Sequence, residues 1–391
     1  MHEGTTDERQ GFRDMAPLHG SEAELAMSRL RESRDWTRDL GRLISAERAE
    51  DVVRRWNGIG GVEAFQTDVV KPFLDHLMAH TTQGVTMEVS GEAEQAGMLF
   101  LSNHRDIVLD PSLVNVALME RGRSSTEIGI GSNLLGSEWI RDLVRLNRCF
   151  VVNREGSARE RFHHSHRTAS YIRHVISHNT PVWLAHREGR AKDGIDATAP
   201  ALIRTLSDGC REDTWNDLRV VPVSISYEWD PCDAMKVNEL LHRELNGQYN
   251  KRPGEDEMSM WAGLVGNKGR VHVHLAPVME WQQGPSEVRP ERWMADAFDA
   301  ILTSNMKAWP NQRIAAERLN LDRDIAMLAP TPSSHDESVW STRLQAIQQE
   351  LEGRGWKVQD VERKWCEMLA APLIHRHRLL HEMSHSNRAS D

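Results

Sequence analysis

Short apolar runs alternate with amphipathic segments of helix length between residues 85 and 280, and this alternation constrains the fold more than any other feature. The apolar runs begin at residues 85, 98, 127, 149, 181, 219 and 271. Helix-like segments separate most of them, such as residues 111–121, 158–178 and 233–246. Strands that alternate with helices predict an α/β domain with a mixed, largely parallel sheet covered by helices.

The sequence on either side of this domain is helical in pattern. Apolar residues recur at spacings of three and four before residue 80, and again in residues 290–309, 338–352 and 361–380. We therefore expect three parts: an N-terminal helical region (1–84), an α/β domain (85–280) and a C-terminal helical region (281–391).

The composition is that of a globular protein without a general affinity for nucleic acid. Hydrophobic residues make up 39% of the 391 residues, too many for a disordered chain, and the net charge is -10. Four scattered cysteines without a C-x-x-C pair argue against a disulfide scaffold or a zinc ribbon and favour a reduced, cytoplasmic setting. The first residues lack the apolar stretch of a secretory signal, and no window reaches the ~18 apolar residues of a membrane span.

The stretch LFLSNHRDIVLDPSLVNVAL, residues 99–118, is the most informative for function. It reads as a strand ending at Ser102, a loop, and a helix for which Asp110 and Pro111 form an N-cap and N1 pair. His104 in such a loop can act as a general base if a carboxylate holds its other ring nitrogen. Asp110 or Asp106 can supply that carboxylate.

Three further strand ends carry related features. Arg154 directly follows the run CFVVN, and the loop after PVWLAHR offers Glu188, Gly189 and Arg190. The apolar run VVPVSISYE contains Pro222, which predicts an edge strand or a bulge because proline cannot donate to a sheet ladder.

These four motifs, in this order, resemble the glycerolipid acyltransferase family, the glycerol-3-phosphate and 1-acylglycerol-3-phosphate acyltransferases. The resemblance covers about residues 95–230. It implies a catalytic dyad of His104 and Asp110, a site for the acceptor's phosphate at Arg154 and the Glu188–Gly189–Arg190 loop, and a strand bearing Pro222. Two spacings depart from the family pattern: five residues instead of four separate His104 from Asp110, and Arg190 follows Gly189 one position early.

The implied activity is transfer of a fatty acyl group from acyl-CoA or acyl carrier protein to a hydroxyl of a phosphorylated glycerol. The expected acceptor is 1-acylglycerol-3-phosphate, in phospholipid biosynthesis, and the reaction needs no metal or redox cofactor. The residues agree independently, because the chemistry requires a base and no G-x-S-x-G nucleophile elbow is present. A lipid-binding protein that keeps this architecture without activity is the alternative.

Location follows from the charge distribution. Residues 141–192 hold eleven basic and four acidic side chains, a net charge of +7 within a chain of -10. Such a concentration suits a phosphate or an anionic lipid surface. We expect a cytoplasmic protein that binds peripherally at the inner face of the membrane.

Two other patterns are candidates for metal sites. HEMSH, residues 381–385, matches the H-E-x-x-H motif of zinc hydrolases but sits in a His- and Arg-rich chain end without a downstream third ligand. His272 and His274 alternate on one predicted strand and so share a face, but no neighbouring residue in sequence completes a ligand set. We expect a charged helix end at the first and a polar sheet face at the second.

Overall fold

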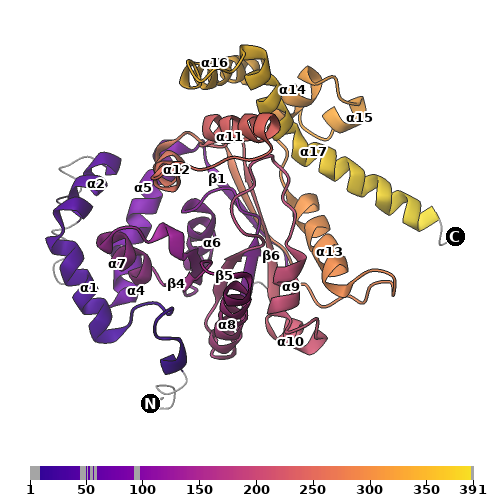
Figure 1. The fold of residues 1–391 in the computed structure, drawn as a ribbon. Coiled ribbons are helices and arrows are strands. Elements are labelled where there is room, and N and C mark those ends of the chain that lie inside the picture. The colour runs from indigo at the N-terminus through magenta and orange to yellow at the C-terminus, as the bar shows by residue number, and fades with distance from the viewer. Residues whose placement is uncertain are drawn as a thin grey trace.

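The computed structural model describes the backbone of residues 9–44, 50, 52, 56, 60–91 and 97–388 (Figure 1). In Figure 1 a sheet occupies the middle of the molecule, the N-terminal helices lie on one side of it, and the C-terminal helices lie on the other side and above.

Within these residues, seven strands form one sheet in the order β1-β7-β6-β2-β5-β3-β4. They are β1 (Val85–Val89), β2 (Leu99–Ser102), β3 (Glu127–Gly131), β4 (Cys149–Val152), β5 (Val182–Ala185), β6 (Val220–Tyr227) and β7 (Val271–Leu275). The pairing is parallel throughout except between β6 and β7. The predicted mixed, mostly parallel sheet is confirmed, and each predicted apolar run forms one of its strands.

Helices cover both faces of the sheet, which explains why its central strands are apolar without alternation. Phe100 on β2 packs in the cluster that includes α6 (Leu109–Glu120). Its neighbour Leu101 packs on the opposite face, with α8 (Ala158–Ser177) and α13 (Pro290–Asn305). The hydrophobic core therefore consists of two layers, one on each side of the sheet.

The three helices expected inside the domain are confirmed. They are α6, α8 and α11 (Asp233–Asn246), each within two residues of its predicted start. In α8 the side chain of Ser157 accepts a hydrogen bond from the N–H of Glu160, and the Glu160 carboxylate accepts one from the N–H of Ser157. This reciprocal pair satisfies two of the free donors at the start of the helix.

The remaining helical elements lie around this domain. On the N-terminal side are η1 (Arg9–Phe12), α1 (Gly20–Glu32), α2 (Arg34–Ile44), α4 (Val62–Phe65), the π-helical turn η2 (Gln66–Val70) and α5 (Lys71–Thr81). Within the domain are η3 (Ser132–Leu134), α7 (Glu138–Leu146), α9 (Pro200–Leu206), α10 (Glu212–Asp217) and α12 (Glu255–Val265). After it come α14 (Pro310–Arg318), α15 (Arg323–Ala326), α16 (Ser334–Glu350) and α17 (Val358–Arg388).

Each flanking group has a core of its own. Trp36, Trp56 and Phe65 from the N-terminal side pack with Leu146 of α7. On the C-terminal side, buried side chains of α11, α14, α16 and α17 surround Trp340 and Trp365.

The expectation that Pro222 marks an edge strand is wrong. β6 lies inside the sheet between β7 and β2, and Pro222 is in register with Leu101 of β2. The ladder with β7 starts one residue later, at Val223. Beside Pro222 the chain beyond β7 donates instead, from the N–H of Ala276 to the carbonyl oxygen of Pro222. On the side of β6 that faces this segment, residue 222 needs to supply only a carbonyl acceptor and no N–H donor. Proline can therefore occupy the position.

Candidate active site

Except for Pro222, the predicted site residues gather beyond the carboxyl ends of the strands β2, β4, β5 and β6. These strands point in the same direction, so the residues that follow them meet at one edge. His104 follows β2, Arg154 follows β4, and residues 188–190 follow β5.

Asn103 anchors the loop that carries His104. Its side-chain amide donates to the carbonyl oxygen of Ile225 at 3.0 Å, and its amide oxygen accepts from the N–H of Ile225 at 2.8 Å. Asn103 is fully buried, so this two-way bond to β6 is shielded from water. The start of the loop is thereby held against the centre of the sheet.

Asp110 is the residue that holds His104. Its Oδ2 accepts a hydrogen bond from Nδ1 of His104 at 2.9 Å, and from the backbone N–H groups of Arg105 at 2.7 Å and Asp106 at 2.9 Å. The hydroxyl of Tyr227 donates to its Oδ1 at 2.9 Å. Burial and the neighbouring Asp110 carboxylate raise the pKa of Tyr227 well above its usual value, so the phenol keeps the proton that it donates.

This arrangement selects one tautomer of His104. With the proton on Nδ1 and donated to Asp110, Nε2 carries the lone pair. His104 also lines the large cavity described below. The imidazole can therefore accept a proton from a group bound in that cavity, and the buried carboxylate stabilises the imidazolium that results.

Asp106, the second candidate for this carboxylate, has a different contact. Its Oδ1 accepts from the N–H groups of Val108 at 2.9 Å and Leu109 at 2.8 Å, where α6 begins. Burial and the nearby Asp110 raise the pKa of the Asp106 carboxyl. The expected N-cap role of Asp110 is wrong: Val108 occupies that position, and Asp110 lies in the first turn of the helix. The fifth residue between His104 and Asp110 therefore does not prevent the contact between their side chains.

A cavity of about 680 Å³ opens beside His104. One part of its wall is apolar and comes from the N-terminal helices, β3 and α12, with Leu40, Val69, Phe73, Ile130 and Leu264 among its residues. Another part is charged and mixed in sign, with the basic residues Arg154, Arg187, Arg190, Lys192, Arg243 and Lys251 and the acidic residues Asp39, Glu155, Glu188, Asp193, Glu239, Asp256 and Glu257. The cavity therefore joins an apolar surface and a charged surface beside one histidine.

Arg154, Glu188 and Gly189 form part of the charged wall. The Arg154 guanidinium passes over Gly131 at the end of β3 and lies 3.8 Å from the Glu188 carboxylate. Glu188 is mostly exposed, so this ion pair is loose and contributes little. Gly189 has a φ of 70°, a left-handed conformation that glycine adopts at low cost. The guanidinium of Arg154 remains accessible from the cavity.

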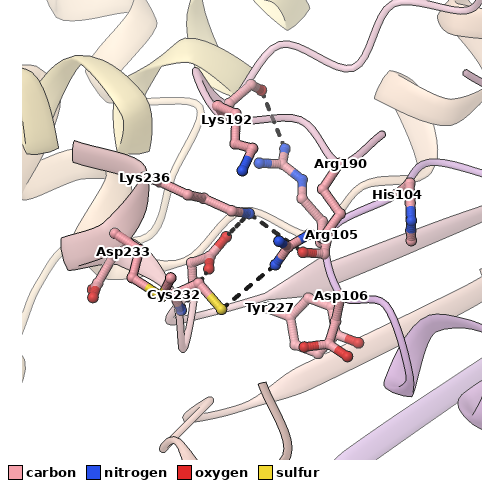
Figure 2. A network of polar contacts seen from close by, with 12 residues as sticks. His104, Arg105, Asp106, Arg190, Lys192, Tyr227, Cys232, Asp233 and Lys236 are labelled. Atoms are coloured by element: carbon pink, nitrogen blue, oxygen red, sulfur yellow. Dashed lines mark hydrogen bonds and ion pairs between the residues drawn. The ribbon is translucent and has the colours of Figure 1, made fainter. Parts of the chain in front are cut away.

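Arg190 is held more firmly. It is 7% exposed, and its guanidinium contacts Sγ of Cys232 at 3.6 Å (Figure 2). Lys236 lies beside this pair and donates to the Asp230 carboxylate and, at 3.3 Å, to the carbonyl oxygen of Arg105. The start of α11 and the segment before it therefore support both Arg190 and the loop that follows His104.

A buried polar chain supports the loop after β5. His186 is fully buried, and its Nδ1 lies 2.9 Å from the hydroxyl of Thr198, which itself donates to the Asp299 carboxylate of α13 at 2.5 Å. The hydroxyl thus accepts from His186 while it donates to Asp299. Burial lowers the pKa of His186 to about 4 and raises the pKa of Asp299 to about 7.

The predicted basic stretch does not form one continuous exposed face. Arg145 donates to the carbonyl oxygen of Ala16, Arg173 donates to that of Leu206, and Arg190 is buried. Arg159 and Arg161 near the start of α8 are exposed. Part of the positive charge is therefore used inside the fold.

Several residues of the site have no signal in the sequence. Pro222 belongs to the buried sheet and does not line the cavity, whereas Asn103, Tyr227 and Lys236 support it. Tyr227 lies more than a hundred residues from Asp110, so no local spacing predicts their contact. The backbone of the HEMSH motif belongs to the end of α17, and its side chains beyond His381 lie outside the described part of the structure.

Comparison with known proteins identifies the class. Residues 85–225 match the family model named Acyltransferase. No curated protein matches the chain. Among solved structures, the 1-acyl-sn-glycerophosphate acyltransferase PlsC of Thermotoga maritima is similar, with 12% sequence identity and a TM-score of 0.37 over 72% of this chain and 97% of that one.

Residues 85–225 are an acyltransferase domain, and the protein is an acyltransferase. The predicted acyltransferase domain is confirmed over these residues. Among the described residues, no helix combines the length and the apolar character needed to cross a membrane.

Proposed function

We propose that this acyltransferase transfers a fatty acyl group from acyl-CoA or acyl carrier protein to the free hydroxyl of 1-acylglycerol-3-phosphate, as a step of phospholipid biosynthesis. The observation that carries the proposal is the cavity at His104, which joins an apolar wall and a charged wall containing Arg154 and Arg190 in one space. A substrate with a hydrocarbon chain and a phosphate fits such a space better than a wholly polar or wholly apolar one.

His104 and Asp110 supply the chemistry. Nε2 of His104 takes the proton of the acceptor hydroxyl as its oxygen attacks the thioester carbonyl, and the carbon–sulfur bond then breaks. The departing thiolate receives the proton from the imidazolium, so an ester and a free thiol are formed and His104 is regenerated. Asp110 keeps the ring oriented through Nδ1.

The two walls bind the two ends of the substrates. The apolar wall below the N-terminal helices accepts a fatty acyl chain, whose burial stabilises the complex by about 0.8 kcal/mol per CH₂. Arg154 and Arg190 bind the acceptor phosphate, since guanidinium groups pair with phosphate oxygens through two parallel hydrogen bonds. Glu188 and Gly189 belong to the loop that presents Arg190, and the Glu188 carboxylate lies 3.8 Å from Arg154.

Peripheral binding at the inner face of the membrane gives access to a lysolipid acceptor. The exposed start of α8 is the part of the basic stretch that fits this role, with Arg159 and Arg161 beside Phe162, whose side chain is 59% exposed. An exposed aromatic ring flanked by arginines is suited to an anionic lipid surface.

Thiol release from a panel of acyl thioesters, with and without each acceptor, tests the function. We expect release that depends on a phosphorylated acceptor, and a loss of roughly 10²- to 10⁴-fold in His104→Ala. The variant should unfold at nearly the same temperature as the parent, because His104 belongs to a loop at the cavity wall.

Each result separates the alternatives. Acceptor-dependent turnover excludes a lipid-binding protein without activity. Lipid binding without turnover for any donor and acceptor would overturn the proposal in favour of that alternative. Activity of His104→Ala within a few-fold of the parent would exclude His104 as the base.

A further inference from the structure

The polar sheet face at β1 and β7 brings together three side chains that the acyltransferase site does not use. His272 and His274 lie on the same face of β7, and Glu88 of β1 is in register with His274. The sequence lacks a third ligand near the two histidines, but the parallel pairing of β1 with β7 supplies one from more than 180 residues away. None of the three lines the cavity at His104.

The geometry of the three side chains suits a metal ion. Oε2 of Glu88 lies 3.9 Å from Nε2 of His272 and 3.7 Å from Nδ1 of His274, and the ligand atoms all lie within 4.8 Å of one another. Bonds of about 2.0–2.2 Å to a tetrahedral ion require neighbouring ligand atoms roughly 3.4 Å apart. The Glu88 side chain is 61% exposed and can approach both rings, and the two imidazole nitrogens, which lie within 4.8 Å of each other, turn toward the ion as it binds.

The hydrogen bonds of Thr86 orient His272 for such a role. The Thr86 hydroxyl lies 3.3 Å from the carbonyl oxygen of Val271 and 2.8 Å from Nδ1 of His272. When it donates to the carbonyl oxygen, it accepts from Nδ1–H of His272, and Nε2 then presents a lone pair toward the Glu88 carboxylate. In that tautomer a cation can bind between the two groups, and a hydroxyl behind a ring is the usual support of a metal-binding histidine.

We propose that Glu88, His272 and His274 bind one divalent transition-metal ion of the zinc class, which ties the edge strand β1 to β7. Two imidazoles and one carboxylate select such an ion over Mg²⁺ and Ca²⁺, which prefer oxygen ligands. Water completes the coordination. The ion thereby joins the strand that follows the N-terminal helices to the central sheet.

Zinc binding by the full chain tests the site. After treatment with a chelator, the protein is titrated with Zn²⁺ against a competing chelator, and its unfolding temperature is measured with Zn²⁺, Mg²⁺ or Ca²⁺. We expect one tight equivalent of Zn²⁺ at this site and a higher unfolding temperature with Zn²⁺ alone. Glu88→Gln and His274→Gln should lose that equivalent and the stabilisation, while Thr86→Val should bind about 10- to 100-fold more weakly.

A matched control addresses the other histidine-rich motif of the chain. The double variant His381→Gln, His385→Gln removes both histidines of HEMSH and should keep the equivalent that Glu88→Gln loses. Because Glu88 is exposed, Glu88→Gln should unfold without metal at the temperature of the metal-free parent. The proposal is overturned if the parent binds no tight equivalent, if Glu88→Gln binds like the parent, or if the HEMSH variant loses the equivalent instead.

Discussion

At the scale of single residues, Asp110 determines the geometry of the loop that carries His104. One of its oxygens holds His104 and the two backbone N–H groups that follow it, and the other receives the Tyr227 hydroxyl. A fully buried carboxylate is costly without such donors, so the loop and the carboxylate stabilise each other.

Exchanging the two loop carboxylates for amides distinguishes their roles. Asp110→Asn should lose most of the activity, because an amide cannot stabilise the imidazolium of His104. The fold should survive, because the Tyr227 hydroxyl can turn to accept from the new amide. Asp106→Asn keeps an acceptor for the N–H groups of Val108 and Leu109 and should lose much less. Steady-state rates and unfolding temperatures check both variants, and the reverse order of activity would assign the partner role to Asp106.

Removing Arg154 should affect the acceptor more than the donor. Loss of a hydrogen bond between a charged group and phosphate costs about 1.5–3 kcal/mol, which corresponds to a rise of roughly 10- to 150-fold in the apparent KM for the acceptor. The KM for the acyl thioester should change little. Arg190→Ala serves as the buried counterpart and should also lower stability, since it removes the partner of Cys232. An equal loss with a phosphate-free acceptor would contradict the role of Arg154.

At the scale of elements, the chain from His186 through Thr198 to Asp299 joins the loop after β5 to α13. Its two titrating groups have opposite effects on stability. Between pH 4 and 6.5 the unfolded chain protonates His186 and the folded chain does not, so acidification lowers the free energy of unfolding. Between pH 3.8 and about 7 the folded chain holds a proton on Asp299 that the unfolded chain has released, so acidification raises it.

Asp299→Asn should therefore expose the contribution of His186. In the parent the two effects largely cancel between pH 4.5 and 6.5, whereas in the variant the free energy of unfolding should fall by about 2 kcal/mol on acidification over this range, from 1.36 kcal/mol per pKa unit. Urea unfolding at pH 6.5 and 4.5 measures the difference. Parallel pH profiles for parent and variant would show that the two groups do not act in this way.

At the scale of the whole molecule, the distribution of charge predicts how the enzyme meets a membrane. The chain is acidic overall, so an anionic surface repels it except where basic side chains are exposed. Binding to vesicles with anionic lipid should be strongest at low salt, because attraction between exposed charges is screened within ~10 Å at 0.1 M salt.

Sedimentation with such vesicles, at low and at high salt, checks this expectation. The double variant Arg159→Ala, Arg161→Ala should bind more weakly at low salt, while the pair Arg313→Ala, Arg318→Ala on α14 keeps the same change in net charge as a control. Equal loss in both would show that net charge matters and the position does not. Binding that salt does not weaken would indicate hydrophobic insertion instead.

The sequence by itself determined the architecture and the order of the site residues. All seven apolar runs became strands, because a strand buried on both faces needs a continuous apolar segment wherever it lies in the sheet. His104, Arg154 and the loop around Gly189 could be assigned to one edge for a related reason: parallel strands bring their carboxyl ends together whatever their order.

Only the tertiary structure decided which side chains meet. Asp110 contacts His104 from the first turn of α6, which starts two residues earlier than expected, and Tyr227 and Asn103 complete the site through contacts with β6 from distant parts of the chain. Pro222 lies inside the sheet and not on an edge strand. Proline is tolerated there because the segment after β7 donates to its carbonyl oxygen. Glu88 reaches His274 in the same way, through strand order. Local patterns encode periodicity and turns, whereas the order and register of strands depend on the packing of the whole chain, which no spacing along the sequence contains.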